Sequence, residues 1–295
     1  MKASEINIRD PYVLEYDKKY YLYGTRGPTT WGLADGFDCY ISSDLENWDG
    51  PIEIFHNNGD FWADRNYWAP ECHHYKGEFY LFATFNSEKR HMGTQILKSD
   101  SPAGPFKILS NGPVTPLDQE CLDGTLYIDL NGTPHMVFSG SFKKNHKGEM
   151  FVQELTIDLR APVGEPRLLF LAADAPWTVP FPKGKEAFNI EEPIYFSDGP
   201  FLYRTKSGKL LLLWSSFGEG GYSLGIASSD NDEMDGNWTH DEKPLFANGG
   251  HGMIFKSLSG TPFLTLHYPN EHLCERPLFF ELIEVNDRLL LKNKS

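Results

Sequence analysis

Long apolar runs are missing from this 295-residue sequence. The two longest, Leu168 to Ala173 and Leu210 to Trp214, fall far short of the roughly 20 residues that a helix needs to cross a bilayer. The first ten residues, MKASEINIRD, contain no apolar stretch of the kind that forms a secretion signal. We therefore expect no membrane partner and a cytoplasmic location.

Basic residues are also scarce, with 27 Lys and Arg against 41 Asp and Glu, for a net charge of -14. This balance argues against a nucleic-acid partner, because such proteins need a basic surface to displace counterions from phosphates. Only four cysteines are present, at positions 39, 72, 121 and 274, and none forms a C-x-x-C pair. We expect free thiols, with neither a zinc site nor a disulfide framework.

Helical periodicity is lacking as well, since no stretch of ten or more residues has the apolar spacing of an amphipathic helix. Instead, five segments repeat one form, a turn followed by an aromatic and aliphatic strand: DKKYYLYGT, KGEFYLFAT, NGTPHMVFSG, SGKLLLLWSS and SGTPFLTLHY. Their turns lie at Lys18, Gly77, Gly132, Gly208 and Gly260. Apart from the longer third interval, the spacing is about 50 to 60 residues, which fits one four-stranded blade per repeat.

The repeats predict an all-β fold, a five-bladed β-propeller, formed by a single domain over residues 1–295. The longer third interval contains DAPWTVPFPKGKEAFNIEEP, residues 174–193, which we interpret as an insertion between blades. A β-sandwich of similar composition is the alternative. Five copies of one repeat favour a closed ring.

One polar residue precedes each repeat turn: Asp10, Glu71, Asp123, Asp198 and His251. If each turn closes the first hairpin of a blade, these residues begin the inner strands and converge on the central channel. Carboxyl groups that converge in a partly dry channel cannot all keep their ordinary pKa values, because burial and like charge both favour protonation. One neutral acid and one carboxylate are what the hydrolysis of a glycosidic bond requires.

The ordered segments IRDPYVLEYDKKYYLYGT, YWAPECHHYKGEFYLFAT, CLDGTLYIDLNGTPHMVF, SDGPFLYRTKSGKLLLLWSS and GGHGMIF resemble glycoside hydrolase family 43. The resemblance implies a five-bladed propeller that acts on arabinose- or xylose-containing oligosaccharides. It also implies that Asp10 is the general base, that Asp123 tunes and orients the acid, and that Asp198 is the general acid. Hydrolysis with inversion would follow, for which the two carboxyl groups lie roughly 6.5 to 9.5 Å apart.

The main departure from the family pattern is Asp198, where the family normally has glutamate in an EGP motif. Aspartate shortens the reach of the acid by about 1.5 Å, and a misplacement of about 1 Å can cost on the order of 100-fold in rate. Glu191 and Glu192 are nearby substitutes for the acid. The alternative function is therefore a carbohydrate-binding propeller with weak or lost catalysis. Gly124 is a second departure, since the family often has proline there.

Sugar binding needs aromatic platforms, and Trp68 and Trp31 are the candidates. We also expect Glu71 and Arg276 to contact substrate. The resemblance further implies that His251 helps to hold a hydrated calcium ion in the channel, although calcium prefers oxygen ligands.

A third interpretation is a fructan-active propeller of the related retaining clan, suggested by the Glu71-Cys72 pair. That clan begins with a tryptophan-asparagine-aspartate motif, which this sequence lacks. The preferred function remains an α-L-arabinofuranosidase or β-xylosidase, and the sequence gives no basis for an oligomeric state.

Overall fold

The computed structural model describes residues 1–141 and 143–292, whose strands form five antiparallel sheets. Blade 1 contains β1 (Ile8–Tyr16), β2 (Lys19–Arg26), β3 (Gly36–Ser42) and β4 (Asp49–His56). Blade 2 contains β5 (Arg65–Tyr75), β6 (Glu78–Ser87), β7 (Arg90–Ser99) and β8 (Lys107–Ile108). Blade 3 contains β9 (Cys121–Ile128), β10 (Pro134–Gly140), β11 (Glu149–Leu155) and β12 (Pro162–Leu171).

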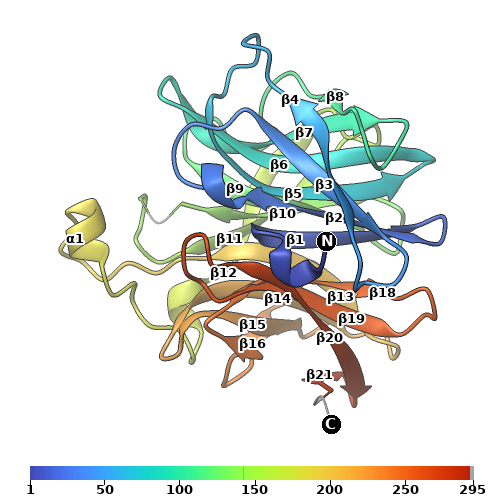
Figure 1. Cartoon of the computed structure of the whole chain (residues 1–295). Helices are drawn as coiled ribbons and strands as arrows, with labels where there is room; N and C mark the ends of the chain where they lie inside the picture. The colour runs from blue at the N-terminus through green and yellow to red at the C-terminus, as the bar shows by residue number, and fades with distance from the viewer. Residues whose placement is uncertain (142, 293–295) are drawn as a thin grey trace.

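Blade 4 contains β13 (Asp198–Arg204), β14 (Leu210–Gly218), β15 (Gly221–Ser229) and β16 (Trp238–His240), and β17 (Phe246–Ala247) also pairs with β15. Blade 5 contains β18 (Gly250–Lys256), β19 (Pro262–Tyr268), β20 (Arg276–Val285) and β21 (Arg288–Leu291). The first strands of successive blades contact one another in order, and β18 returns to β1 (Figure 1). The predicted five-bladed propeller is confirmed.

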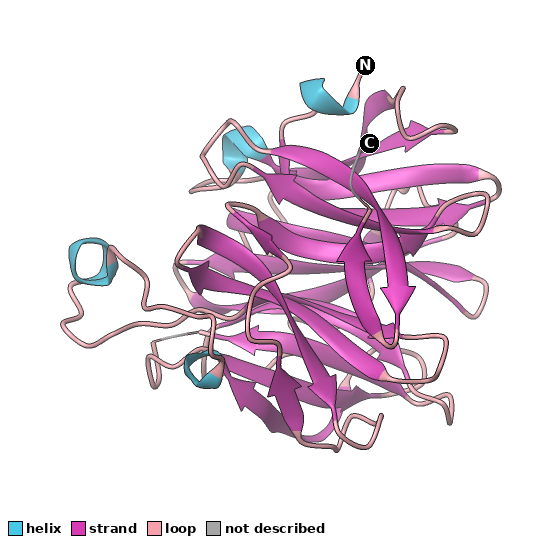
Figure 2. Ribbon diagram, turned by 90° about the horizontal axis from the view of Figure 1, so that it is seen from below, coloured by secondary structure: helices cyan, strands magenta, loops and turns pink. Residues whose placement is uncertain are grey.

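Helices are short and lie outside the sheets (Figure 2). They are the 3-10 turns η1 (Ala3–Glu5), η2 (Gly27–Thr29) and η3 (Ala172–Asp174), and the five-residue α1 (Gly184–Phe188). Among the described helices, none is long and apolar enough to cross a membrane. The four cysteines, at positions 39, 72, 121 and 274, are free. The predicted domain runs to residue 295, and residues 293–295 lie outside the described part.

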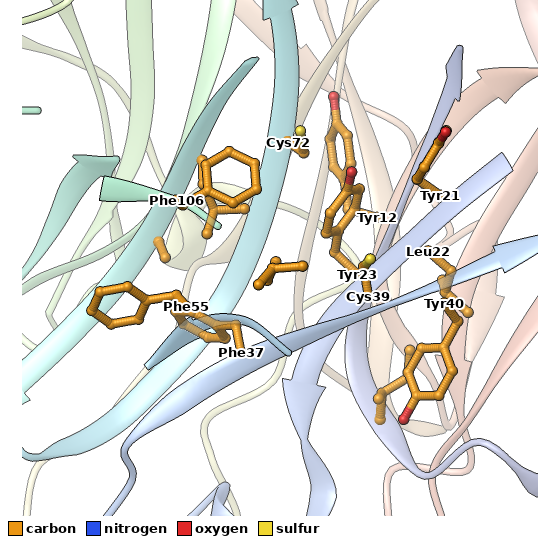
Figure 3. Packing of buried hydrophobic residues seen from close by; sticks show 14 of the residues in the cluster. Tyr12, Tyr21, Leu22, Tyr23, Phe37, Cys39, Tyr40, Phe55, Cys72 and Phe106 are labelled. Atoms are coloured by element: carbon orange, nitrogen blue, oxygen red, sulfur yellow. The ribbon is translucent and has the colours of Figure 1, made fainter. Parts of the chain in front are cut away.

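The repeat that was visible in the sequence is the second strand of each blade. Neighbouring blades pack face to face, so these strands are covered on both faces; β6 and β14 each contain seven consecutive buried residues. Burial on both faces replaces polar alternation with a continuous apolar run. Figure 3 shows one such interface, where Tyr12, Tyr23, Phe37 and Cys72 meet between blades 1 and 2.

Each inner strand contains a β-bulge that begins with a residue in the left-handed backbone region. We call these five the bulge residues: Asp10, Ala69, Asp123, Gly199 and His251, with φ of 54°, 46°, 56°, 51° and 50°. At each one the pairing with the second strand skips two residues. The next residue is proline in three blades, because a proline needs no hydrogen-bond partner for its nitrogen at a bulge. The Asp-Pro, Ala-Pro and Gly-Pro pairs of the sequence therefore mark the same structural feature, the β-bulge of an inner strand.

Four of the bulge residues bind the preceding blade through their backbone N–H. Ala69 donates to the Thr25 hydroxyl and His251 to the Ser215 hydroxyl, both at 2.8 Å. Equivalent bonds run from Asp123 to the Thr84 hydroxyl at 2.8 Å, and from Asp10 to His267 Nδ1 at 3.2 Å. Each acceptor lies on the second strand of the blade before, so these inter-blade hydrogen bonds run in one direction around the ring.

Candidate active site

One cavity of about 500 Å³ lies where the five inner strands begin, and residues from every blade line it. The bulge residues Asp10, Asp123 and His251 line it. In four blades the residue directly before the bulge residue also lines the cavity: Arg9, Trp68, Leu122 and Asp198. The equivalent residue of blade 5, Gly250, is not part of the lining. The three predicted catalytic aspartates therefore share this cavity, which we call the hollow.

Asp10 is buried and its two carboxylate oxygens have different partners. Oδ2 accepts a hydrogen bond from the Thr25 hydroxyl at 2.6 Å, and Oδ1 faces His251 Nδ1 at 3.3 Å. Burial would raise its pKa, but the charges of His251 and Arg9 outweigh burial and hold the pKa of Asp10 below its ordinary value. Asp10 is consequently ionised across the neutral pH range.

His267 acts on Asp10 as a neutral acceptor. Burial and the nearby Arg9 lower the pKa of His267 to about 3. Its Nδ1 accepts the Asp10 N–H, which leaves the proton on Nε2, 3.2 Å from Asn270 Oδ1. The ring therefore holds the backbone of the carboxylate in place without neutralising its charge.

His251 is shared between two carboxyl groups. Its Nδ1 lies 3.3 Å from Asp10 Oδ1 and 3.8 Å from Asp123 Oδ2. Burial lowers the pKa of His251, yet the two carboxyl groups outweigh burial and bring it above the ordinary value. A β-carbon on Gly199 would stand only 2.6 Å from the histidine ring, so glycine at this position is what allows the ring to fit.

Asp123 and Asp198 are the carboxyl groups whose pKa values burial raises. Burial raises the pKa of Asp123 to about 6, although His251 opposes the shift and the Gly199 N–H donates to its Oδ2 at 3.1 Å. Burial and the charge of Asp123 raise the pKa of Asp198 to about 7. Tyr222 hydrogen-bonds to the Asp198 carboxyl group. The hollow therefore contains an ionised aspartate and a protonated one, each supplied by a different blade.

The predicted tryptophan platforms both lie at the hollow. Trp31 and Trp68 meet edge to face, with ring centroids 5.4 Å apart. The Trp68 Nε1 donates to the Thr30 carbonyl at 2.6 Å, which fixes its ring, while Trp31 is 57% exposed. Arg9 lies over the Trp31 ring at 5.7 Å and pairs with Glu275 at 2.8 Å.

Two predicted substrate contacts lie elsewhere. Glu71 stands two residues beyond the bulge residue Ala69, and its Oε2 lies 3.0 Å from His73 Nε2. Arg276 donates to the carbonyls of Ser4, Leu273 and Glu275. Neither residue is among the described residues that line the cavity, and their contact with substrate stays a prediction.

The substitute acids and the second departure from the family pattern also have structural answers. Glu191 pairs with Lys185 at 2.8 Å, and neither Glu191 nor Glu192 lines the hollow. The Gly124 N–H donates to the Thr94 hydroxyl at 3.0 Å, and a β-carbon there would lie 2.8 Å from Thr94 and Met136 atoms. Proline at this position would lose the donor and clash with the neighbouring blade.

Metal coordination was predicted at His251. Among the described residues, no group of three or more His, Cys, Asp and Glu side chains is arranged to hold a metal ion. The Nδ1 of His251 faces carboxyl groups, so its donor set does not fit direct calcium binding. A hydrated calcium ion at this histidine stays a prediction and takes no part in the steps below.

Residues that the sequence did not identify also line the hollow, notably Tyr222 and four phenylalanines at positions 181, 188, 196 and 217. Two of these phenylalanines belong to the predicted insertion, which leaves β12, passes through α1 and returns to β13 (Figure 1). The four phenylalanines do not belong to one helix or strand, since Phe188 ends α1, Phe217 lies in β14, and Phe181 and Phe196 lie in loops. Only the length of the insertion marked this part of the chain.

Hydrolysis of a glycosidic bond needs an ionised and a protonated carboxyl group in one hollow, and this propeller supplies both, which places it in the class of glycoside hydrolases. Residues 4–287 match the profile of glycosyl hydrolases family 43, and the chain belongs to that family. The predicted enzyme class and family are confirmed, and the fructan-active interpretation is set aside.

Solved structures similar to this chain include enzymes for arabinan and xylan. An endo-arabinase from Bacteroides thetaiotaomicron VPI-5482 is 35% identical with a TM-score of 0.88, and the match covers 97% of this chain and 98% of that one. An endo-1,4-beta-xylanase from the same strain is 26% identical with a TM-score of 0.76, covering 98% and 95%.

Two curated relatives are more distant. An extracellular endo-alpha-(1->5)-L-arabinanase of Bacillus subtilis (strain 168) is 27% identical over 48% of this chain and 45% of its own length. An extracellular exo-alpha-(1->5)-L-arabinofuranosidase of Cellvibrio japonicus (strain Ueda107) is 28% identical over 35% and 30%. The match thus spans less than half of either relative. Because both are extracellular enzymes, the predicted cytoplasmic location is wrong.

Proposed function

We propose that this chain hydrolyses arabinose-containing oligosaccharides with inversion at the anomeric carbon. The observation that carries the proposal is that Asp10 and Asp198 line one hollow, in which their surroundings lower the pKa of Asp10 and raise that of Asp198. A single displacement needs a carboxylate on one side of the sugar and a carboxylic acid on the other.

Asp10 acts as the general base in this scheme. Its carboxylate takes a proton from a water molecule while the water oxygen bonds to the anomeric carbon. As that bond forms, the bond from the anomeric carbon to the leaving oxygen breaks, and Asp198 gives its proton to that oxygen. Asp10 ends the step protonated and Asp198 ionised, and exchange with solvent restores both. The positive charge of His251 keeps Asp10 ionised between turnovers.

Asp123 serves Asp198 as a positioning residue. Its negative charge raises the pKa of Asp198, and its Oδ2 accepts the N–H of Gly199, the residue that follows the acid. Tyr222 also contacts the acid and lowers its pKa. In this scheme both residues help to position the shorter aspartate side chain, and its competence as the acid is part of the proposal.

Arabinose is favoured over xylose by the pattern of similarity. The 35% identical structure is an endo-arabinase, and both curated relatives act on arabinan or arabinofuranosides. The xylanase structure is 26% identical. Trp31 and Trp68 supply rings for the apolar face of a sugar, which suits either pentose.

The experiment has two parts. Proton NMR during early turnover of an α-L-arabinofuranoside should show β-arabinose first, and initial release of the α anomer would contradict inversion. Asp10→Asn should lower kcat by on the order of 1,000-fold without unfolding the protein, because it removes the base. Asp158→Asn, which changes an exposed surface aspartate, should stay within about twofold of the wild type. Full activity in Asp10→Asn would remove Asp10 from the mechanism.

A further inference from the structure

The insertion before blade 4 brings an apolar surface to the hollow. We call it the phenylalanine wall, formed by Phe181, Phe188, Phe196 and Phe217. The ring centroid of Phe181 lies 4.8 Å from that of Phe217 and 5.1 Å from that of Phe196. Phe188 is 40% exposed and lies 5.9 Å from Phe181. The four rings form one continuous group from the rim inward.

The wall is held to the propeller at several points. Trp177 is buried against Trp214, with ring centroids 4.9 Å apart. The Val179 N–H donates to the Phe217 carbonyl at 2.8 Å, and the Phe181 N–H donates to the Ile194 carbonyl at 2.7 Å. The first two contacts tie the beginning of the insertion to β14 of blade 4, and the third joins Phe181 to the segment that leads into β13. These contacts hold Phe181 close to blade 4.

The wall lies beside Asp198. Phe196 precedes the acid by two residues, and the Ser216 hydroxyl binds its carbonyl at 2.7 Å. Phe217 contacts Tyr222 with centroids 5.6 Å apart, and Tyr222 hydrogen-bonds to Asp198. The tryptophans at positions 31 and 68 come from blades 1 and 2 instead. The hollow therefore has two aromatic sides, and the phenylalanine side is the one next to the acid.

A general acid gives its proton to the leaving oxygen, so the group beyond that oxygen lies next to the acid. A sugar can stack the apolar face of its ring on a phenylalanine. Its hydroxyl groups need polar partners as well, and the four phenylalanine side chains provide none. An aromatic ring needs none and gains from edge or offset contacts with other rings.

We propose that the phenylalanine wall forms a leaving-group site that selects leaving groups carrying an aromatic ring. The inference rests on the proposed role of Asp198 as the acid, and it assigns to the insertion a specificity that the family fold does not require. It predicts arabinosides of phenols as a further substrate class, in addition to the oligosaccharides of the proposed function.

The test compares three substrates with different leaving groups: phenyl α-L-arabinofuranoside, arabinobiose and α-L-arabinofuranosyl fluoride. Phe188→Ala should lower kcat/KM for the phenyl substrate by about tenfold. The leaving group of the fluoride is a single atom, too small to contact the wall, so kcat/KM for the fluoride should change by less than about twofold. Each value is a ratio of variant to wild type on one substrate, so the intrinsic reactivity of the leaving group cancels. Phe188→Leu should retain part of the effect, and Ile157→Ala, an exposed residue outside the hollow, should change nothing.

Equal losses on all three substrates would overturn the proposal, because the wall would then only support the fold. An unchanged phenyl rate in Phe188→Ala would overturn it as well. Calorimetry with phenyl and methyl 1-thio-α-L-arabinofuranoside, whose sulfur linkage resists hydrolysis, separates this inference from the proposed function. Tighter binding of the phenyl compound, lost in Phe188→Ala, would support the wall even if no substrate were hydrolysed. Equal binding of both compounds would count against the wall even in an active enzyme.

Discussion

Blades 1, 3 and 5 differ from blades 2 and 4 at the bulge residue. In the first group this residue is Asp10, Asp123 or His251, and in the second it is Ala69 or Gly199. The backbone conformation is the same in all five. The first group aims ionisable side chains at one another, whereas the second leaves room for them. The bulge is thus a property of the fold, and the chemistry depends on which side chain occupies it.

Blade 4 departs from the others in a second way. The position equivalent to Thr25, Thr84 and Ser215 is Ser139, whose buried hydroxyl has no hydrogen-bond partner among the residues that the structure describes. The N–H that would reach it belongs to Gly199 and instead donates to Asp123. Blade 4 has therefore given up the inter-blade hydrogen bond of its neighbours, and its N–H supports the residue that tunes the acid.

Among the variants that test this comparison of blades, the largest effect should come from filling the space that blade 4 leaves. Gly199→Ala places a β-carbon 2.6 Å from the His251 ring at a φ of 51°. We expect a loss of about 2 to 4 kcal/mol in the free energy of unfolding and a fall of about 100-fold in kcat/KM. Gly208→Ala is the matched control. Gly208 has a φ of 102°, and a β-carbon added there would meet no described atom within 4 Å. It should cost about 1 kcal/mol and no activity. Equal losses in urea unfolding would contradict this difference.

The pH profile tests whether Asp198 and Asp10 really carry opposite protonation states. Because the acid must be protonated, kcat/KM should fall as pH rises through the pKa of Asp198, about 7. At pH 8 it should be about one tenth of its maximum. Asp123→Asn removes a charge that raises this pKa, so the midpoint of its residual activity should move to lower pH. A flat profile from pH 6 to 9 would contradict the assignment of the acid.

The smallest effect concerns the inter-blade hydrogen bonds. Ser215→Ala leaves the buried N–H of His251 without an acceptor and should cost about 1 to 2 kcal/mol in the free energy of unfolding. Ser139→Ala removes a hydroxyl that has no partner and should stay within about 0.5 kcal/mol of the wild type. Urea denaturation of both variants checks this. Equal losses would show that the two blades do not differ.

The repeats predicted the fold because the second strand of every blade is buried on both faces. Such a strand needs consecutive apolar residues, and this run can be recognised in the sequence. The position of the polar residues was harder to predict. Counting back from the turns put Glu71 and Asp198 in phase with Asp10, but the bulges show that Ala69 and Gly199 hold that phase. A left-handed backbone residue has no required side chain, so its phase cannot be read from residue type.

The three acids were nevertheless predicted to converge, and they do. Tyr222 and Phe217 were missed because they lie on the second and third strands of blade 4, where an aromatic residue is indistinguishable from core. The sequence could not show that Arg276 lies outside the lining of the hollow, because an arginine in a sequence carries no sign of its partners. Its guanidinium is occupied by three carbonyl groups, a fact that only three-dimensional contacts supply.

The bond between Asp10 and His267 joins residues 257 positions apart. During synthesis a ribosome adds the aspartate long before it adds His251 and His267, the two histidines that contact it. Until blade 5 has been made, the nascent polypeptide carries Asp10 without either partner. The surroundings of this carboxylate are therefore complete only when blade 5 joins blade 1.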